Sequence, residues 1–328
     1  MREITYREAI REGLREEMRR DDRVFLFGED IADYGGIFKV TEGLQAEFGP
    51  ERVFDTPLSE SAIVGAAVGA SLMGMRPVAE VMFADFTTVA MDAIVNHAAK
   101  ASYMSGGQTP ASLVVRMAYG AGPRWGCHHT QSVESWLTNV PGLTIVMPAT
   151  PYDAKGLLKA AIRTPNPVIF LEHKLLYGKK GEVPDGEYIV PIGKANVAHP
   201  GDAVTVVATG LMVDRALGAA RTLASEGVGV EVIDLRSIQP LDEETILSSV
   251  ERTGRLVIVH EAPVRGGFGG EIAAVVSAKA LGFLDAPVQR VGAPWVPVPF
   301  GQILVDAYVP SEADIVRAVG AILRGADA

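Results

Sequence analysis

The sequence from residue 24 to residue 30 is VFLFGED, a short apolar run that ends in a glycine and two acids. Runs of this length, bounded by turn residues, are typical of strands buried in a parallel sheet. Just before it, Tyr6, Ile10, Leu14 and Met18 recur at the spacing of an amphipathic helix. This part of the sequence therefore predicts a helix followed by a buried strand.

The same alternation of helix and strand patterns continues in two blocks. In the first block we expect strands at 24–27, 78–82, 113–116, 144–147 and 168–171, and helices at 61–73, 89–104 and 152–163. In the second we expect strands at 203–208, 228–234, 255–260 and 288–291, helices at 211–225, 243–252 and 270–281, and a last helix carrying Ile315, Val319 and Ile322. The pattern predicts an α/β fold with parallel sheets, in two domains at 1–184 and 203–328 joined by a linker at 185–202.

Composition narrows the possible functions. The net charge of −10 gives no basic surface for nucleic acid or anionic membranes. A single cysteine, Cys127, excludes an intrachain disulfide and a multi-cysteine zinc site, and fits a reducing compartment. The longest apolar stretch, about 62–75, is too short to span a bilayer, and the acidic N-terminal region is unlike a signal or transit peptide. We expect a soluble, cytoplasmic protein.

The first candidate for chemistry is the stretch 55–65, which reads DTPLSESAIVG. A proline turn leads into a helix, with Ser59 available as the cap and Glu60 in or near the first turn. Taken alone, the negative charge of Glu60 would only stabilise the helix, by about 0.3–1 kcal/mol, because it lies at the positive end of the helix dipole. The helix that follows is apolar nearly all round, with small residues at Gly65 and Gly69, so we expect it to be buried in a core or a subunit interface. A carboxylate at the edge of such a dry region is a candidate functional group.

Two further stretches carry possible site residues. Phe83 and Phe86, in EVMFADF at 80–86, could be core residues or could present a flat face to a heteroaromatic ring. The glycine-rich stretch GAGPRWGCHHTQ at 120–131 follows the strand 113–116, at the end where α/β sheets place ligands. Its histidines, His128 and His129, could bind metal or bond their own loop, but proton transfer suits a loop imidazole better than metal binding does. A nucleophilic Cys127 beside them is a further alternative.

The second block contains a glycine cluster, GGFGG at 266–270. It is similar to a dinucleotide-binding loop, but Ile272 stands where that fingerprint requires its third glycine. We favour a tight strand-to-helix turn. The broken fingerprint also argues against a stand-alone oxidoreductase that uses a nicotinamide or flavin dinucleotide.

Five motifs together resemble one protein family. They are DTPLSE at 55–60, EVMFADF at 80–86, YMSGG at 103–107, HHTQS at 128–132 and TPYDAKGLLKAAI at 150–162. In this order they resemble the beta subunit of the thiamine-diphosphate-dependent decarboxylase of 2-oxo acid dehydrogenase complexes, which includes the pyruvate, branched-chain 2-oxo acid and acetoin enzymes. The resemblance runs from about residue 4 to residue 322. It implies a pyrimidine-binding domain followed by a transketolase C-terminal-type domain.

The resemblance also implies roles for single residues. Glu60 matches the glutamate that hydrogen-bonds N1′ of the cofactor's aminopyrimidine, Phe86 matches the aromatic residue lying against that ring, and Leu58 is a further cofactor-binding position. His129, the second histidine of the pair, matches a histidine that orients the donor as the acyl group passes to a lipoyl arm. Thr130 departs from the serine usual at the next position.

Thiamine diphosphate enzymes usually anchor the diphosphate through Mg²⁺ with a Gly-Asp-Gly segment, followed by an asparagine. Here the segment at 201–203 reads GDA, and no suitable asparagine follows. The resemblance therefore implies that a separate alpha subunit holds Mg²⁺ and the diphosphate in an α2β2 assembly, which docks on a lipoyl acyltransferase core. Some family members also bind a monovalent cation such as K⁺, at positions that match Leu113, Ala161, Thr164 and Asn166. Thr164 stands where the family often has aspartate.

The function implied is oxidative decarboxylation of a 2-oxo acid, pyruvate or branched-chain, with acyl transfer to a lipoyl group. An acetoin dehydrogenase beta subunit and a non-catalytic docking subunit of the same complex are the alternatives. The family motifs are retained around Glu60, Phe86 and His129. A subunit that only docks its partners would not need these residues, so their retention argues against the docking role. The sequence leaves the choice of substrate open.

Overall fold

The structure, a computed structural model, describes residues 1–122 and 124–324. The chain folds into two compact units, and both have the predicted α/β architecture. The first unit contains residues 1–119 and 136–192, and the second contains 120–135 and the chain from Gly193 onward. The segment 120–135, which the sequence places in the middle of the first block, thus belongs in space to the second unit.

Parallel strands form the sheet of the first unit, in the order β6-β7-β5-β4-β2-β3. Gly28 at the end of β2 is level with Asp55 and Glu80, so several acids meet at the carboxyl edge of this sheet. A Cβ atom at Gly28 would lie 2.7 Å from the Glu80 carbonyl oxygen, which is why glycine stands there. The bounds are β2 (Val24–Gly28), β3 (Val53–Asp55), β4 (Arg76–Val81), β5 (Val114–Tyr119), β6 (Thr144–Val146) and β7 (Val168–His173).

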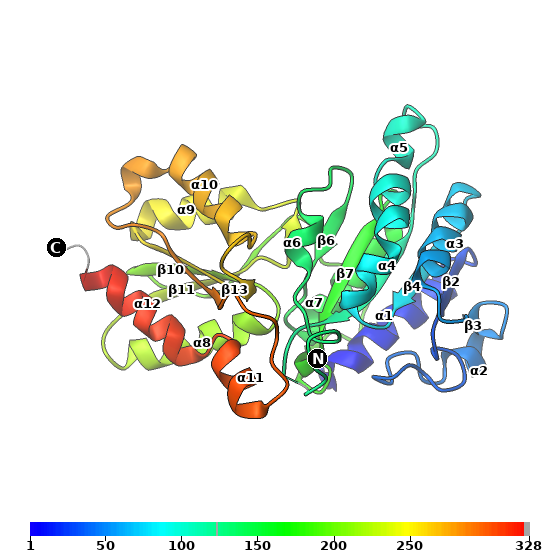
Figure 1. The fold of residues 1–328 in the computed structure, drawn as a ribbon, viewed down its shortest axis with the longest axis horizontal. Helices are drawn as coiled ribbons and strands as arrows, with labels where there is room; N and C mark the ends of the chain where they lie inside the picture. Colours follow the sequence, from blue (N-terminus) through cyan, green and yellow to red (C-terminus); the bar gives the residue numbers. More distant parts are fainter. Residues whose placement is uncertain (123, 325–328) are drawn as a thin grey trace. The chain divides into compact units, whose positions relative to one another are not determined.

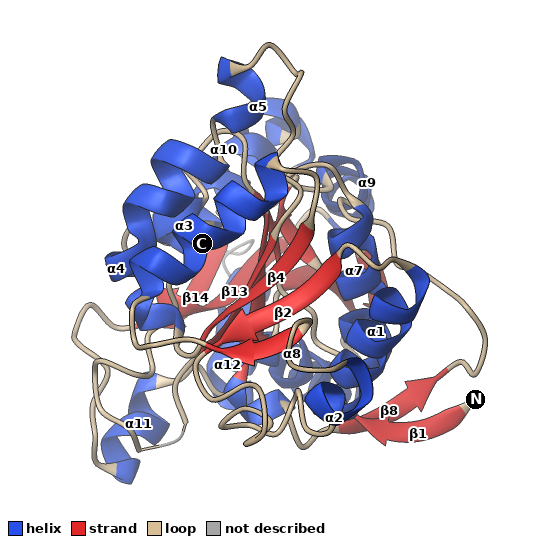
Figure 2. Cartoon of the chain, turned by 90° about the vertical axis from the view of Figure 1, so that its right-hand side faces the viewer, coloured by secondary structure: helices blue, strands red, loops and turns tan. Residues whose placement is uncertain are grey.

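Helices cover both faces of this sheet, as continuous apolar strands require. Figure 2 shows α3 (Glu60–Leu72) and α4 (Thr87–Asp92) on one face, and α1 (Tyr6–Arg20) and α7 (Pro151–Arg163) on the other. The helix expected over 89–104 is interrupted, because Ala99 donates its N–H to Ile94 in a π-helical turn before α5 (Ala101–Met104). The remaining elements are the antiparallel pair β1 (Arg2–Thr5) and β8 (Lys180–Val183), with α2 (Leu44–Phe48) and α6 (Glu134–Leu137).

The second unit has its own five-stranded sheet, in the order β14-β13-β10-β11-β9. Neighbouring strands in this sheet are parallel, except that β9 pairs antiparallel with β11. Strand β9 lies within the stretch expected to be a linker. The strands are β9 (Asn196–His199), β10 (Val204–Ala208), β11 (Val230–Asp234), β13 (Leu256–Pro263) and β14 (Gln289–Ala293), and a short strand β12 (Ser237–Gln239) lies outside this sheet.

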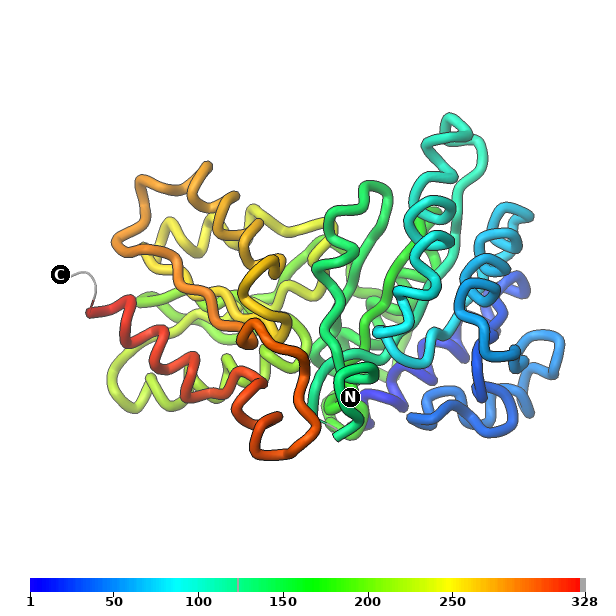
Figure 3. The backbone as a smooth tube through the Cα atoms, viewed as in Figure 1, coloured from blue at the N-terminus to red at the C-terminus, as the bar shows by residue number. Residues whose placement is uncertain are grey.

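Helices α8 (Leu211–Ala224) and α12 (Glu312–Arg324) lie on one face of this sheet, and α9 (Glu243–Thr253) and α10 (Gly269–Lys279) on the other (Figure 1). Figure 3 traces the chain, in orange to red, from β14 through α11 (Gln302–Tyr308) into α12. The sequence patterns did not predict α11. In the described part of the chain, no helix is long and apolar enough to cross a membrane.

The glycine cluster 266–270 is a strand-to-helix turn, as the sequence favoured, and it packs around a buried histidine. A Cβ atom at Gly267 would lie 2.4 Å from Cε1 of His260, and one at Gly269 would lie 2.9 Å from its Nε2. The glycines therefore leave space for the imidazole ring. Burial lowers the pKa of His260 to about 4, so this ring is neutral at physiological pH.

Candidate functional site

Glu60 is the first residue of α3, at the carboxyl edge of the first sheet. Only 9% of its surface is exposed, although it carries a carboxyl group. Ser59 precedes it as the N-cap residue, but the expected side-chain cap is wrong, because the Ser59 side chain makes no capping hydrogen bond. A nearly buried acid thus stands at the positive end of the helix, where a negative charge is favoured.

A second buried acid, Glu29, directly follows β2 and interacts with Glu60. It is 5% exposed, and its Oε1 has no hydrogen-bond partner among the residues that the structure describes. Burial, together with the negative charges of Glu60, Asp30 and Glu80, raises the pKa of Glu29 to about 6. Glu29 was not among the predicted site residues, although an acid directly after a buried strand is a signal of a ligand site.

Phe86 lies at the start of α4, which packs on the same face of the sheet as α3 (Figure 2). It immediately precedes α4, and the Ser61 hydroxyl donates to the Val89 carbonyl at 2.6 Å, which ties the start of α3 to α4. Phe83 is buried and meets Phe86 edge-on, with ring centroids 6.1 Å apart. Of the two aromatic residues, Phe83 is therefore a core residue, and Phe86 remains partly exposed.

An apolar cavity of about 430 Å³ lies beside the first turn of α3. Its lining includes Thr56, whose buried Oγ1 has no hydrogen-bond partner in the described parts of the chain. The other lining residues are Phe25, Phe27, Phe54, Pro57, Ser59, Ala62, Ile63, Ala66 and Ala70. Leu58, in the turn before the helix, has 83% of its surface exposed.

Within this chain α3 is buried on one face only, and its expected burial in a core or a subunit interface stays a prediction for the other face. One face, which includes Ile63 and Val68, packs on the sheet side. The opposite face, with Gly65, Gly69 and Leu72, is exposed. Small apolar residues lie on both faces, so the sequence alone could not show which face the rest of the chain covers.

The histidine loop, defined here as residues 120–135, belongs to the second unit. Its base is closed by the Gly120 N–H, which donates to the Gln131 carbonyl at 3.2 Å. His129 is half-buried, and the buried Thr130 donates its hydroxyl to the Gly126 carbonyl at 2.5 Å. Within the described residues, no group of three or more His, Cys, Asp or Glu side chains is placed to hold a metal ion.

The positions that match a monovalent cation site fit a cation poorly. The Arg76 guanidinium donates to the carbonyl oxygen of Thr164 at 3.3 Å and to that of Ile162 at 2.6 Å. The Leu113 carbonyl already accepts the Val168 N–H at 2.9 Å. A permanent positive charge at the Thr164 carbonyl repels a second cation.

The acids and the aromatic ring of the first unit fit the pyrimidine end of thiamine diphosphate. An aminopyrimidine offers a ring nitrogen to a carboxyl group and a flat face to Phe86. The segment 201–203 is placed differently, since it comes just before β10, at the amino end of that strand. In open α/β sheets, ligands bind at the opposite, carboxyl ends.

Two domain families match the chain, one after the other along the sequence. Residues 2–180 match the transketolase pyrimidine binding domain, and residues 193–315 match the transketolase C-terminal domain. A split-gene transketolase, solved as an inactive β4 tetramer, has a similar structure with a TM-score of 0.82 at 26% identity, covering 98% of this chain and 99% of the other.

Several relatives are similar over nearly the whole chain. The beta subunit of acetoin:2,6-dichlorophenolindophenol oxidoreductase from Cupriavidus necator is 49% identical over 99% of this chain and 98% of its own length. The 2-oxoisovalerate dehydrogenase subunit beta of Bacillus subtilis is 49% identical, covering 90% of each chain. The pyruvate dehydrogenase E1 component subunit beta of Rickettsia bellii is 47% identical over 97% of this chain and 98% of its own length. The chain therefore belongs to the family of beta subunits of 2-oxo acid and acetoin dehydrogenases, built from transketolase-type pyrimidine-binding and C-terminal domains.

Proposed function

We propose that this chain is the beta subunit of a thiamine-diphosphate-dependent 2-oxo acid dehydrogenase, which decarboxylates a 2-oxo acid and transfers the acyl group to lipoamide. One observation supports it above the others. Glu60 lies nearly buried at the start of α3, and it interacts with Glu29, whose Oε1 has no partner among the described residues. Unneutralised buried acids are typical of sites that bind or protonate a ligand.

The residues of the first unit would hold the aminopyrimidine ring. Thiamine diphosphate, when bound, supplies a carbon nucleophile for the 2-oxo carbon and accepts the electrons released with CO₂. Glu60 would hold a proton at the N1′ nitrogen of the ring, and Phe86 would lie against the ring face. Glu29, with its pKa raised to about 6, stays partly protonated near neutral pH and limits the negative charge around Glu60.

The proposal assigns the remaining functions to His129 and to partner chains. His129 would orient the acyl donor and move a proton as the acyl group passes to a lipoyl arm. An alpha subunit would hold Mg²⁺ and the diphosphate in an α2β2 enzyme bound to a lipoyl acyltransferase core. A cytoplasmic location is part of the proposal, because a single cysteine fits a reducing compartment.

The test is reconstitution with the alpha subunit from the same organism. We expect neither chain alone, but the two together, to reduce an artificial electron acceptor in the presence of thiamine diphosphate, Mg²⁺ and a 2-oxo acid. Glu60→Gln should lower this activity by at least about 10²-fold, the scale of lost acid–base catalysis. Glu51→Gln, an exposed glutamate of the same unit, is the matched control and should leave activity unchanged. Full activity of Glu60→Gln would contradict the role assigned to Glu60.

An acetoin dehydrogenase beta subunit is the second candidate. It is favoured by the acetoin relative from Cupriavidus necator, which matches over 99% of this chain. A substrate panel of pyruvate, branched-chain 2-oxo acids and acetoin, offered to the reconstituted enzyme, separates the candidates. The substrate with the highest kcat/KM decides between them.

A further inference from the structure

The histidine loop is attached to the end of β13 through one buried carboxylate. Glu261 is 4% exposed, and its Oε1 accepts two hydrogen bonds from the loop. The Ala121 N–H donates at 2.7 Å, and the Ser132 hydroxyl donates at 2.9 Å. These two donors lie on opposite sides of His129 in the sequence, so a single oxygen joins the two arms of the loop.

Further contacts fix the loop to the same corner of the second unit. The Ala262 N–H, one residue beyond Glu261, donates to the Glu134 carboxylate. The Phe268 N–H, at the start of α10, donates to the Ser135 hydroxyl at 3.1 Å. The end of the loop is thus held by the turn that encloses His260.

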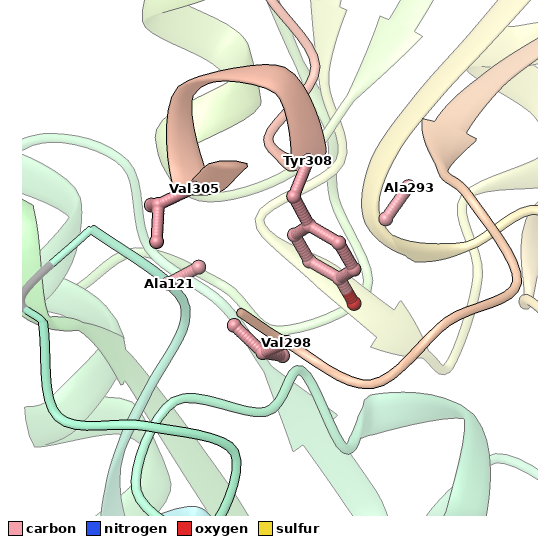
Figure 4. Close-up of a cluster of buried hydrophobic side chains, with 5 residues drawn as sticks. All are labelled: Ala121, Ala293, Val298, Val305 and Tyr308. Atoms are coloured by element: carbon pink, nitrogen blue, oxygen red, sulfur yellow. The ribbon is translucent and has the colours of Figure 1, made fainter. Parts of the chain in front are cut away.

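The start of the loop is held by apolar packing. Ala121 is fully buried in a small cluster with four residues that come from β14, α11 and the segment between them. Figure 4 shows Val305 projecting from α11 toward Ala121, and Tyr308 projecting from the same helix on the side of Val298 and Ala293. This cluster gives α11 a role that its sequence pattern did not suggest. The members of the cluster are Ala121, Ala293, Val298, Val305 and Tyr308.

We propose that Glu261 is a positioning residue for His129, holding both arms of the histidine loop so that the imidazole has one defined position. The inference rests on the proposed function of His129. Losing the acceptor leaves the buried Ala121 N–H and the half-buried Ser132 hydroxyl without this partner, and an unpaired buried donor is costly. A displacement of about 1 Å in a catalytic group can cost about 10²-fold in rate.

Hydrogen exchange tests the attachment without any assay of activity. In the full chain, Glu261→Met should speed exchange in peptides that cover 120–135 by at least about tenfold, because an apolar side chain of similar size accepts neither bond. Glu261→Gln keeps an amide oxygen as the acceptor and should fall between Glu261→Met and wild type. Glu271→Gln, an exposed glutamate of α10, is the control and should not change exchange in these peptides.

If Glu261→Met does not fold, Ser132→Ala replaces it as the informative variant. It removes one of the two bonds and should speed exchange in the same peptides by a smaller factor. Wild-type exchange rates in whichever of these two variants is measured would overturn the proposal.

A double-mutant cycle in the reconstituted α2β2 enzyme separates positioning from general stability. Glu261→Met should lower the rate of acyl transfer to a lipoyl domain by about 10²-fold, with a smaller effect on the KM for thiamine diphosphate. Added to His129→Ala, it should cost little more, because the group that it positions is already gone. Additive losses in the double variant would overturn the proposal.

The two possible failures can be told apart. If His129→Ala keeps full transfer activity, the assigned role of His129 is wrong and the positioning role falls with it. If His129→Ala is inactive while Glu261→Met shows normal exchange and normal transfer, only the inference about Glu261 is overturned.

Discussion

Two groups of buried charge lie at the carboxyl edge of the first sheet, and they differ in how they are neutralised. In one, Arg116 donates to Glu80 at 2.6 Å and to both carboxylate oxygens of Glu172 at 2.7 and 2.8 Å, and the Tyr177 hydroxyl donates to Glu172 at 2.8 Å. In the other, the charges that act on Glu29 are those of further acids.

The pKa shifts of the two groups follow this difference. Burial alone would lower the pKa of Arg116, but Glu172 and Glu80 raise it above its ordinary value, so the cation is permanent. For Glu29, burial and the neighbouring acids act in the same direction, and together they raise its pKa to about 6. The group around Arg116 is neutralised within the chain. Glu29 keeps a buried oxygen without a partner among the described residues, and in the proposed function the ligand would supply the donor.

The largest effect on stability is expected from a substitution that removes Arg116 from its ion pairs with Glu80 and Glu172. Arg116→Met should lower the free energy of unfolding by about 3–5 kcal/mol, because it leaves Glu80 and Glu172 buried without their cation. Chemical denaturation of the purified chain measures this. Arg7→Met, at an exposed arginine of α1, is the control and should change stability by less than about 0.5 kcal/mol. A loss below about 1 kcal/mol in Arg116→Met would mean that the buried pair is not needed.

The next effect concerns a buried acid of the second unit, Glu134. Burial, together with the charge of Glu261, raises its pKa to about 7. Because the folded state binds the proton more tightly than the unfolded state, the protein loses stability as pH rises from about 4.5 to about 7. Glu134→Gln should therefore stabilise the protein by up to about 3 kcal/mol above pH 7. The gain should fade as pH drops toward 4.5.

Thermal unfolding of wild type and Glu134→Gln at several pH values between 4.5 and 8.5 measures this difference. A gain that does not vary with pH would show that ionisation of Glu134 is not its cause. Glu271→Gln serves as the control, since that glutamate is exposed.

Replacing Glu29 by its amide should also stabilise the protein, by less than the same change at Glu134. Its pKa of about 6 implies that Glu29→Gln stabilises the isolated chain by up to about 2 kcal/mol above pH 6, with no gain below about pH 4.5. In the reconstituted enzyme the same variant should raise the KM for thiamine diphosphate. A variant that gains stability and loses function is typical of a binding site. A stabilised variant with unchanged KM would instead assign Glu29 to structure alone.

The sequence predicted the strands and helices that depend on local pattern. The apolar run at 24–27 became β2, and the helical spacing from Tyr6 to Met18 became α1. Glu60 was predicted as a site residue because a motif marks it. The position of Glu29 near other acids depends on strand register, which places Gly28 level with Glu80. The attachment of the histidine loop depends on Glu261, which lies 140 residues from Ala121 in the sequence. No local pattern carries information about either contact.

The local sequence pattern also could not show which face of α3 the chain itself covers. A substitution at Gly65, on the exposed face, tests this and has the smallest expected effect on stability. A Cβ atom at Gly65 would meet nothing within 4 Å, so Gly65→Ala should stabilise the isolated chain by about 1 kcal/mol through helix propensity alone. Gly28→Ala is the contrasting control and should destabilise it, because its Cβ would lie 2.7 Å from the Glu80 carbonyl oxygen.

If the exposed face of α3 packs closely against another subunit in the proposed α2β2 enzyme, Gly65→Ala should also weaken assembly with the alpha subunit. Denaturation of the isolated chain and sedimentation of the mixture measure the two effects separately. Normal assembly of the stabilised variant would show that this face stays open in the complete enzyme, and the site around Glu60 would then be closed by contacts elsewhere.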